Sequence, residues 1–404
     1  MANLFGFPFT KKSDTAISNT GWVVTDGVTV DTLAGNDKVE GTSTEGGVGL
    51  AAGAGIAIGF DSTLDTSDGN DVVIGTSTGG GAGIAGGAGI AIGEGSTLYT
   101  GDGNDKVEGT STGGGEGTAG GAGIGIAYDS TLETGKGNDV VKGTSTGGGE
   151  GLAGGDGIAI GFNSTLDSGD GTDVVIGTST GGGEGYASGV GIAIAYFSTL
   201  DTGAGNDKVE GTSTGGGVGA AGGDGIAIAF DSTLVTGAGN DTVTGTGKGD
   251  GGVGGVGIVI AFGSTLDTGD GNDVVTGSTV GGFAGIRVFE DCALTTGDGN
   301  DIVNALNGGF SGSGTVNLGT GNDVLKGFQQ NNTYGIGNFF GGSGRDQILL
   351  SEGIYMISGS TITNGSSVTM NVSEFERIGG TKGNLFNFAD GTLTVGTDGF
   401  ATFA

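Results

Sequence analysis

Histidine is absent from this sequence of 404 residues, and Cys292 is the single cysteine. These two counts exclude histidine-based catalytic triads, zinc sites of the finger and protease types, and an intramolecular disulfide framework. Proline occurs once, beside 103 glycines. Collagen needs glycine at every third position together with abundant proline, so the glycine content must have a different origin.

Basic residues are also scarce, because 13 Lys and Arg stand against 45 Asp and Glu, which gives a formal net charge of −32. Nucleic-acid phosphates and anionic lipid headgroups repel such a chain, so we expect neither as a direct partner. No run of 18 apolar residues is present, so we expect no membrane insertion. Lys11 and Lys12 follow a very short apolar stretch, the reverse of a cleaved secretory signal.

The sequence is dominated by a repeat whose most regular element is the tripeptide Gly-Asn-Asp or a near variant. Its aspartates recur with a constant period of 34 from Asp37 to Asp241, and the later intervals, up to Asp346, are 32, 28, 22 and 23. The residues around each aspartate are nearly the same from repeat to repeat, with Ser-Thr-Leu before it and Val-Val-Ile-Gly-Thr-Ser-Thr or a variant after it. A fixed period of this kind indicates one supersecondary unit stacked on itself.

Each unit has the pattern of short β-strands. In the repeats from Asp37 to Asp241, the second residue after the aspartate is always valine, whereas the third varies as Glu40, Ile74 or Lys142. The valines therefore face inward. Ile90, Ile92 and the later Leu98 fit two further strands in the same way. The prediction is an all-β fold, a parallel β-solenoid with three short strands in each coil. The inward valines are Val39, Val73, Val107, Val141, Val175, Val209 and Val243.

The later, shorter repeats show that one repeat is one coil. Compared with the full period, six residues are lost between Asp273 and Asp301 and twelve between Asp301 and Asp323, and the loss falls in the glycine-rich tract. If each repeat held two equal coils, one whole coil, half of the repeat, would be expected to disappear at once. We therefore expect the coil length to equal the repeat period, which is about 34 and shortens to about 22 toward the C-terminus. The glycine-rich tract is then the expandable side of the coil.

The corner of each coil carries the candidate chemistry. Residues 341–349, Gly-Gly-Ser-Gly-Arg-Asp-Gln-Ile-Leu, fit the nonapeptide G-G-x-G-x-D-x-U-x at every fixed position, and the other corners fit it with the first glycine replaced. This pattern resembles the RTX (repeats-in-toxin) calcium-binding β-roll family, in which loop carbonyls and the aspartate bind Ca²⁺ between consecutive loops. The resemblance implies these carboxylate ligands: Asp37, Asp71, Asp105, Asp139, Asp173, Asp207, Asp241, Asp273, Asp301, Asp323 and Asp346.

Physical arguments favour a cation here as well. Calcium takes six to eight oxygens in irregular geometry, and a column of aspartates about 4.8 Å apart repels itself unless cations lie between them. A second acidic position, three residues earlier, strengthens some corners and is Ala34, Lys136, Ala204 or Ala238 in weaker ones. One motif per coil supports one column of ions. The alternative is a metal-free corner closed by hydrogen-bonded ladders, because Asn, Asp and Gly suit turns anyway. The second position is acidic at Asp68, Asp102, Asp170, Asp270 and Asp298.

The two ends differ from the repeats and predict three regions: residues 1–25, the solenoid at 26–349, and a C-terminal β cap at 350–404. The alternation around Pro8 predicts that Phe5, Phe7 and Phe9 share one face. This segment suits either a plug for the open end of a neighbouring molecule or a cap on the chain's own first coil. The C-terminal stretch is similar to the ends of repeat-rich calcium-binding proteins of cyanobacterial surfaces. RTX-type proteins use an uncleaved C-terminal signal for type I secretion, and residues 398–404 are compatible with one.

Two surfaces suggest further roles. One face of the glycine-rich tract (79–89) is nearly bare backbone, suited either to lateral packing between molecules or to a loop folded on the solenoid. The threonines of the repeated Thr-Ser-Thr face outward and resemble the T-x-T array of ice-binding β-helices. However, Lys38, Glu40 and Glu108 share that face and would disturb an ordered water lattice.

The repeat therefore predicts a secreted, calcium-binding structural or cell-surface protein that assembles head-to-tail, and laterally, into filaments or a surface layer. We expect it to be extracellular and not an enzyme, because the acidic residues follow the repeat and form no off-pattern pair. The alternatives are a carbohydrate-active β-helix enzyme or an adhesin for cell-surface polysaccharide, and ice binding through the threonines.

Overall fold

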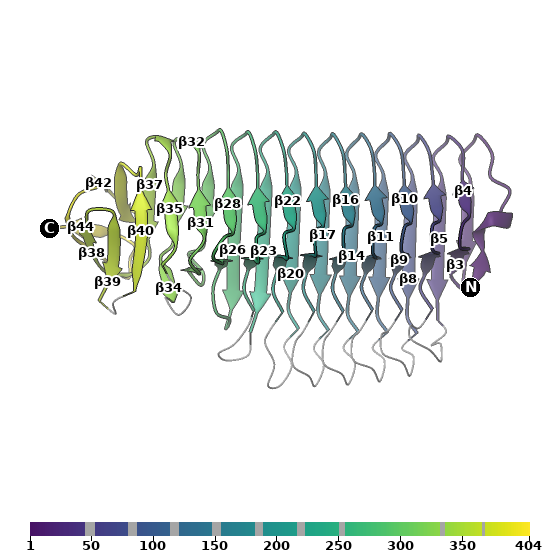
Figure 1. The fold of residues 1–404 in the computed structure, drawn as a ribbon, viewed down its shortest axis with the longest axis horizontal. Coiled ribbons are helices and arrows are strands. Elements are labelled where there is room, and N and C mark those ends of the chain that lie inside the picture. The colour runs from purple at the N-terminus through teal and green to yellow at the C-terminus, as the bar shows by residue number, and fades with distance from the viewer. Residues whose placement is uncertain are drawn as a thin grey trace.

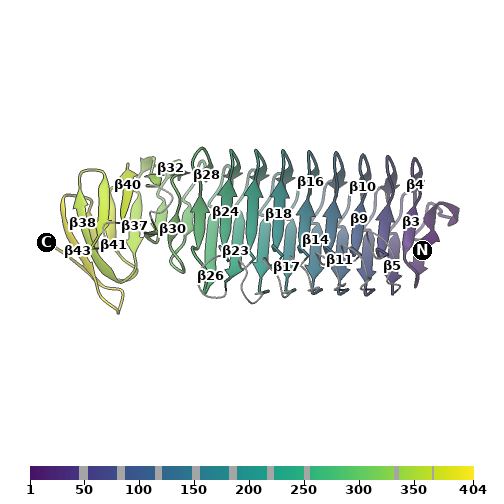
Figure 2. The same ribbon diagram turned by 60° about the horizontal axis from the view of Figure 1, so that its bottom comes forward.

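The computed structural model shows a long, straight β-solenoid (Figures 1 and 2), with the N-terminus at one end and the C-terminus at the other. It describes residues 1–44, 53–79, 87–113, 121–147, 155–181, 189–215, 223–249, 255–331, 336–365 and 368–404. Three β-sheets run along its whole length, and strands of one coil pair in parallel with the same strands of the next. The described residues include no helix long and apolar enough to cross a membrane.

Sheet A carries the Ile-Ala-Ile segments, and its isoleucines point into the core while the small residue between them faces outward. Its strands, in spatial order, are β1 (Ala2–Asn3), β3 (Trp22–Val24), β6 (Ile56–Ile58), β9 (Ile90–Ile92), β12 (Ile124–Ile126), β15 (Ile158–Ile160), β18 (Ile192–Ala195), β21 (Ile226–Ala229), β24 (Ile258–Ala261), β27 (Ile286–Val288), β30 (Phe310–Ser311) and β34 (Gln329–Asn331).

Sheet B carries the strand that follows each aspartate. Its strands are β2 (Thr15–Ser18), β5 (Lys38–Ser43), β8 (Val72–Ser77), β11 (Lys106–Ser111), β14 (Val140–Ser145), β17 (Val174–Ser179), β20 (Lys208–Ser213), β23 (Thr242–Lys248), β26 (Val274–Val280), β29 (Ile302–Asn304), β33 (Val324–Lys326), β37 (Gln347–Leu350), β41 (Arg377–Gly380) and β42 (Leu385–Asn387).

Sheet C carries the Ser-Thr-Leu segments and extends into the C-terminal region. Its strands are β4 (Thr29–Asp31), β7 (Thr63–Asp65), β10 (Thr97–Tyr99), β13 (Thr131–Glu133), β16 (Thr165–Asp167), β19 (Thr199–Asp201), β22 (Thr233–Val235), β25 (Thr265–Asp267), β28 (Ala293–Thr295), β31 (Thr315–Asn317), β35 (Asn338–Phe340), β40 (Thr369–Ser373), β39 (Thr361–Asn364), β38 (Gly353–Ser358), β43 (Gly391–Val395) and β44 (Ala401–Phe403). A small pair, β32 (Thr320–Gly321) and β36 (Ser343–Gly344), lies at two corners.

The pairing register confirms that one repeat is one coil. Leu98 pairs with Leu132 and Val107 with Val141, so each residue meets its equivalent in the next repeat. The core is consequently a set of columns of like side chains, and the valines, isoleucines and leucines predicted to face inward are fully or almost fully buried. Identical apolar residues stacked about 4.8 Å apart bury their area against one another, which stabilises the coil-on-coil arrangement.

The glycine-rich tracts fall largely outside the described residues, so the predicted lateral packing through their bare faces lies there too. The described parts of sheets A and B flank each tract, for example at Thr78 and Gly89. Where the repeat shortens, β28 still pairs with β31 and β29 with β33 in register. The loss of residues therefore leaves sheets B and C intact.

The N-terminal segment lies on its own first coil. Strands β2 and β3, both within residues 1–25, already belong to sheets B and A. The prediction that Phe5, Phe7 and Phe9 share one face is wrong. The Asn3 side chain accepts a hydrogen bond from Phe5 N–H and starts a 3₁₀ turn, η1 (Leu4–Gly6), which interrupts the alternation. Phe7 and Phe9 pack against the core, whereas Phe5 is 64% exposed.

The C-terminal region ends the solenoid with antiparallel pairing. Strands β40 and β41 still pair in parallel with β35 and β37 of the last repeat, and the remaining strands then turn back on themselves. Ile357, Ile362 and Leu393 are buried within this cap. Antiparallel strands can be joined by tight turns, which lets a short segment cover the last open coil.

Candidate metal centre

The candidate site is the corner between sheets C and B, which recurs in every coil along the upper edge of Figure 1. In one coil it comprises residues 100–105, Thr-Gly-Asp-Gly-Asn-Asp, between β10 and β11. The two end residues of this stretch, Thr100 and Asp105, are buried, whereas Asp102 and Asn104 between them are exposed. The corner therefore has an inner and an outer set of polar side chains.

Two glycines allow the tight turn of this corner and its close stacking on the corner of the preceding coil. Gly101 has a φ of +88°, in the left-handed region that favours glycine. Gly103 is required for a different reason, because a Cβ there would overlap the Gly69 carbonyl of the preceding coil. The same close approach recurs at the equivalent glycine of each later corner, so the carbonyls of this position form a stacked column.

The inner aspartates form a hydrogen-bonded ladder. The Asp71 N–H donates to Asp105 Oδ1 at 2.8 Å, and the Asp105 N–H donates to Asp139 Oδ1 at 2.7 Å. The ladder continues with the same geometry to Asp346, and no member from Asp37 onward is more than 2% exposed. The structure therefore brings the predicted ligands of the repeat into one buried column.

The second carboxylate oxygen, Oδ2, lacks a hydrogen-bond donor in nearly all of the inner aspartates. In the first coil, Asp37 Oδ2 accepts a hydrogen bond from the Thr32 hydroxyl at 2.5 Å. The Thr32 hydroxyl also lies 3.1 Å from the Thr66 carbonyl, and in the next coil the Thr66 hydroxyl donates to the Thr100 carbonyl alone. Buried Oδ2 atoms without a hydrogen-bond donor in the described structure belong to Asp71, Asp105, Asp139, Asp173, Asp207, Asp241, Asp273, Asp301, Asp323 and Asp346.

Burial dominates the electrostatics of this column. It raises the pKa of Asp71 and Asp207 to about 6 and that of Asp105, Asp173, Asp273 and Asp323 to about 7. The hydrogen bond from the preceding aspartate's N–H opposes this shift, as does the hydroxyl of the Thr or Ser five residues earlier, such as Thr66 beside Asp71. Neighbouring carboxylates add to the shift at several rungs. A buried ionised carboxylate without a counter-charge is costly, so the rungs with raised pKa values need either a proton or a bound cation near neutral pH.

The outer asparagines form a second ladder that runs the other way. The Asn104 N–H donates to Asn70 Oδ1 of the preceding coil at 2.8 Å, whereas the Asp105 N–H donates to the following coil. Adjacent residues of each corner are thus tied to the coils on both sides. The hydrogen-bonded ladders of the metal-free alternative are present, yet they leave the inner Oδ2 atoms without partners.

The second acidic set lies on the outer surface, apart from the inner column. Asp68, Asp102, Asp170, Asp270 and Asp298 are all exposed. The described residues contain no group of three or more acidic side chains placed to hold a metal ion together. A calcium ion at this corner would therefore take oxygens from an inner carboxylate and from backbone carbonyls. The buried Oδ2 atoms and the glycine-lined carbonyl column fit that requirement.

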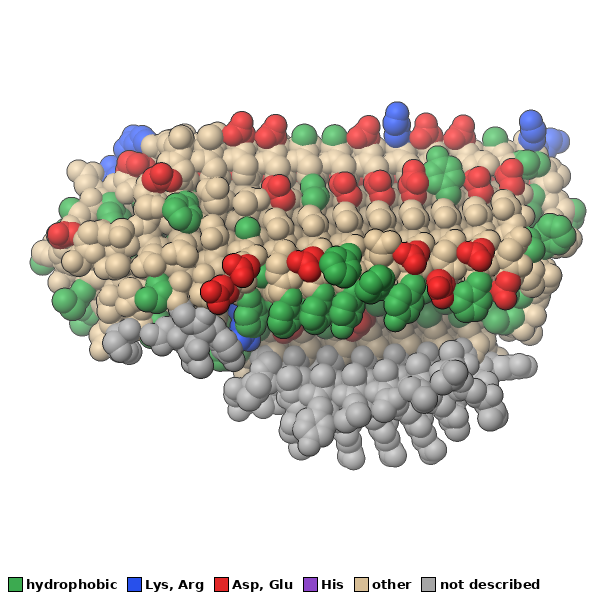
Figure 3. Space-filling view, viewed as in Figure 1, with side chains coloured by type: hydrophobic (Ala, Val, Ile, Leu, Met, Phe, Trp, Pro, Cys, Tyr) green, Lys and Arg blue, Asp and Glu red, His purple; other side chains and the backbone are tan. Residues whose placement is uncertain are grey.

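Two of the outer acids, Asp102 and Asp170, line a shallow groove of about 420 Å³ together with outward residues of sheet C, including Tyr99, Glu133 and Asp167. Figure 3 shows these acidic side chains as two rows along the upper part of the solenoid. Burial, followed by repulsion from the neighbouring carboxylate of the next coil, raises the pKa of Glu133.

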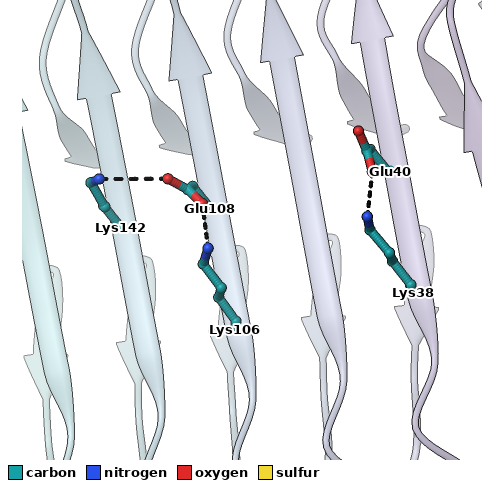
Figure 4. A network of polar contacts seen from close by, with 5 residues as sticks. All are labelled: Lys38, Glu40, Lys106, Glu108 and Lys142. Carbon is teal, nitrogen blue, oxygen red and sulfur yellow. Dashed lines mark ion pairs between the residues drawn. The ribbon is translucent and has the colours of Figure 1, made fainter.

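Sheet B presents the predicted threonine face. Thr76 lies half-buried and Thr78 exposed, with Ser77 buried between them. Ion pairs share this face (Figure 4): Lys106 Nζ lies 2.6 Å from Glu108 Oε2, and Lys142 Nζ lies 3.5 Å from Glu108 Oε1. The lysine hydrogen bond lowers the pKa of Glu108. The threonine columns are therefore bordered by charge, as the sequence predicts.

Sequence reasoning missed an exposed aromatic row at the corner between sheets A and C. Tyr196 and Phe230 stack with ring centroids 4.4 Å apart, and Phe262 continues the stack at 4.6 Å. A groove of about 760 Å³ lies beside the row, lined mainly by small residues of sheet A with Tyr128 and Phe162. Figure 3 shows hydrophobic side chains along the solenoid with acidic side chains beside them. An aromatic recurs at this position in each coil from Tyr128 to Phe262, and this recurrence is the signal that could have revealed the row.

A comparison with known protein families agrees with the resemblance seen in the sequence. The model of the RTX calcium-binding nonapeptide repeat (4 copies) matches residues 95–111, 229–247 and 263–279, three segments that each contain a corner. No curated protein matches the chain. A solved structure described as a hyperactive, Ca²⁺-dependent, β-helical antifreeze protein from an Antarctic bacterium is 19% identical, with 86% of this chain and 81% of that chain covered and a TM-score of 0.38.

Proposed function

Because the chain carries RTX calcium-binding nonapeptide repeats at its corners, we propose that it is a secreted, non-enzymatic structural solenoid that calcium holds in its folded state. The observation that carries the proposal is the column of buried Asp Oδ2 atoms without hydrogen-bond donors. RTX nonapeptide repeats bind Ca²⁺. The assignment of the individual ligands in this chain is a prediction from the geometry.

Calcium suits this column better than other common cations. Its six to eight oxygen ligands can be carboxylates and carbonyls in irregular geometry, whereas magnesium requires a near-ideal octahedron and keeps its water. A buried corner that offers one carboxylate oxygen per rung, with backbone carbonyls around it, has little room for retained water. The inner aspartates are thus the ligands we propose, and the exposed acids such as Asp102 contribute only to the surrounding negative field.

Calcium then acts as part of the fold. A coil rich in glycine has a high conformational entropy cost of ordering, about 1–2 kcal/mol per residue, and its core offers only Val, Ile and Leu side chains to oppose it. An ion that binds only the folded column stabilises it by mass action. The protein would be weakly structured where calcium is scarce and rigid where calcium is abundant, as it is outside the cell.

The decisive experiment is a comparison of the full chain in chelator, calcium and magnesium at pH 7.5. We expect circular dichroism to show loss of the β signal in chelator, recovery with calcium and poor recovery with magnesium. A melting temperature that is the same in chelator and in calcium would instead favour the metal-free ladder, with the rungs protonated.

An extracellular, self-associating role is the finer part of the proposal. It is supported by the exposed aromatic row, since monomeric proteins rarely expose large contiguous apolar surfaces. Tyr128 and Phe262 in this row are each more than half exposed. Lateral contact between solenoids would cover the row, and calcium would screen the acids beside it. Analytical ultracentrifugation of the intact protein in calcium tests this, and a monomer at high concentration contradicts it.

A further inference from the structure

The aspartate ladder does not stop at the last repeat. Asp346 closes the RTX-like series, and its Oδ1 accepts the Asp323 N–H at 2.8 Å. The Asp346 N–H then donates to Glu376 Oε2 at 2.7 Å, the same bond that links every earlier rung. Glu376 lies in the C-terminal cap, where the sequence carries no Gly-Asn-Asp motif.

The backbone places Glu376 at the aspartate position of one more coil. In each repeat, the residue after the aspartate donates its N–H to the aspartate carbonyl of the preceding coil, as Val72 does to Asp37 at 2.8 Å. Arg377 N–H likewise donates to the Asp346 carbonyl at 3.0 Å, and β41 pairs with β37 in register from Gln347 and Arg377. Glu376 is therefore the structural equivalent of the repeat aspartates, supplied by a different residue type.

The corner at Glu376 is smaller than those of the repeats. Three residues, 374–376, connect β40 to β41, whereas six residues, 341–346, follow β35 up to the last aspartate. A glutamate has one more methylene than an aspartate, which lengthens the reach of its carboxylate across the shortened corner. Unlike the inner aspartates, Glu376 is exposed, so its carboxylate remains in contact with solvent.

We propose that Glu376 is the last carboxylate of the calcium column, and that an ion held between it and the Asp346 corner fastens the C-terminal cap to the solenoid. This inference rests on the proposed function. Asp346 itself is fully buried and its Oδ2 has no hydrogen-bond donor in the described structure. The carboxylate of the last corner therefore also needs a proton or a cation. Backbone carbonyls of the two adjoining corners would complete the oxygen set.

The exposure of Glu376 has a consequence for the order of binding. An exposed carboxylate keeps part of its hydration and interacts with the ion through a higher effective dielectric, so the terminal site binds more weakly than the buried ones. As calcium is lowered, the cap loses its fastening ion before the repeats lose theirs. The cap then separates and exposes the open end of the solenoid, whose unpaired backbone groups can pair with another chain.

The test uses the full chain with hydrogen–deuterium exchange followed along a calcium titration. Glu376→Gln keeps an oxygen that can accept the Asp346 N–H and removes the charge. Glu352→Gln removes a charge from another exposed residue of the same region and serves as the matched control. We expect E376Q to raise the calcium concentration at which residues 350–404 become protected by at least about tenfold, with the repeats and E352Q unchanged, and calorimetry to count one calcium fewer.

The outcomes separate the two proposals. If calcium protects no part of the wild-type chain, the proposed function fails. If calcium protects the repeats but E376Q has the same cap midpoint and the same calcium count as the wild type, only the role of Glu376 is overturned. If E376Q loosens the cap equally in chelator and in calcium, Glu376 acts through its hydrogen bond alone, and the inference is again overturned.

Discussion

At the scale of single residues, the two acidic positions of a corner such as residues 100–105 have opposite environments although they are three residues apart. Asp105 is buried in a continuous ladder, and Asp102 is exposed on the outer surface. The inner residue carries a charge that the fold must neutralise, whereas water already solvates the outer one. The same type of residue therefore has a structural role in one position and a largely electrostatic, long-range role in the other.

Asp105→Asn separates these roles because its effect should change sign with calcium. The amide keeps an oxygen for the Asp71 N–H and has no charge to bury. In chelator at pH 7.5 we expect the melting temperature of D105N to equal or exceed that of the wild type, and in calcium to fall below it. Asp102→Asn should stay within about 0.5 kcal/mol in both conditions. Equal losses for D105N with and without calcium would contradict a metal role for Asp105.

The raised pKa values predict how metal-free stability depends on pH. Burial raises the pKa of Asp105 and Asp173 to about 7, above the ordinary value of 3.8, so the folded state prefers the protonated form. The stabilisation is present in full below about pH 4 and is lost as pH rises through about 7. Melting temperatures in chelator should therefore fall from pH 4 to 8, and calcium should remove most of this fall.

A matched pair of variants distinguishes the ladder from general charge repulsion. The net charge of −32 also disfavours the folded state as the acids ionise. D105N should reduce the fall in stability between about pH 4 and 8 by the share of one rung, whereas D102N should not reduce it. The same slope in both variants would assign the effect to the whole charge of the protein.

At the scale of one element, the corner glycines are fixed by inter-coil contact. A coil can repeat at the spacing of a parallel sheet only if its corners stack as closely as its strands do. The Gly69 carbonyl approaches Gly103 so closely that no Cβ fits between them. Glycine is therefore needed at this position by its neighbour in the next coil, in addition to the conformational needs of the turn.

Gly103→Ala should destabilise the protein by about 2 kcal/mol or more, because backbone must shift in two adjacent coils. Gly125→Ala is the control. It lies on the outer face of β12, between Ala91 and Ala159 of the adjacent strands, and an added Cβ has its nearest neighbour 3.9 Å away. We expect G125A to be neutral or to stabilise by about 0.5–1 kcal/mol. Urea unfolding in calcium measures both, and a harmless G103A would contradict the stacked corner.

At the scale of the whole molecule, the covering of the two terminal coils determines whether the solenoid stays monomeric or can assemble head-to-tail into filaments. The N-terminal segment covers its own first coil, with Leu4 buried and Phe7 packed edge-on against Trp22. The C-terminal cap covers the other end. Head-to-tail assembly therefore requires one of these covers to open, and the cap fastened through Glu376 is the one whose opening we link to calcium.

Leu4→Ala tests the self-capping role of the N-terminus. Truncating a fully buried leucine costs about 2–5 kcal/mol, so L4A should increase exchange in the first coil. Phe5→Ala removes a residue that is 64% exposed and should leave exchange unchanged. If F5A abolishes self-association while L4A has no effect on the first coil, the segment is a plug for a neighbouring molecule after all.

The sequence alone determined the solenoid, its one-coil repeat, its inward columns and the resemblance to RTX calcium-binding repeats. It could do so because a constant period forces equivalent positions into register, so that alternation within one strand fixes the environment of a whole column. The inward orientation of the valines after the aspartates and the outward orientation of the threonines follow from the period and the alternation alone. The similarity to cyanobacterial surface proteins and the secretion route stay predictions.

Only the tertiary structure decided which oxygens of the corner are buried, and where the column ends. Asp102 and Asp105 are chemically alike in the sequence, and the path of the turn separates them. Glu376 carries no motif, because its place in the ladder arises from the pairing of β41 with β37, a contact between segments distant in the sequence. The local turn at Asn3 likewise overrode the alternation of Phe5, Phe7 and Phe9. Periodic patterns specify what repeats, whereas ends and turns depend on contacts that occur once.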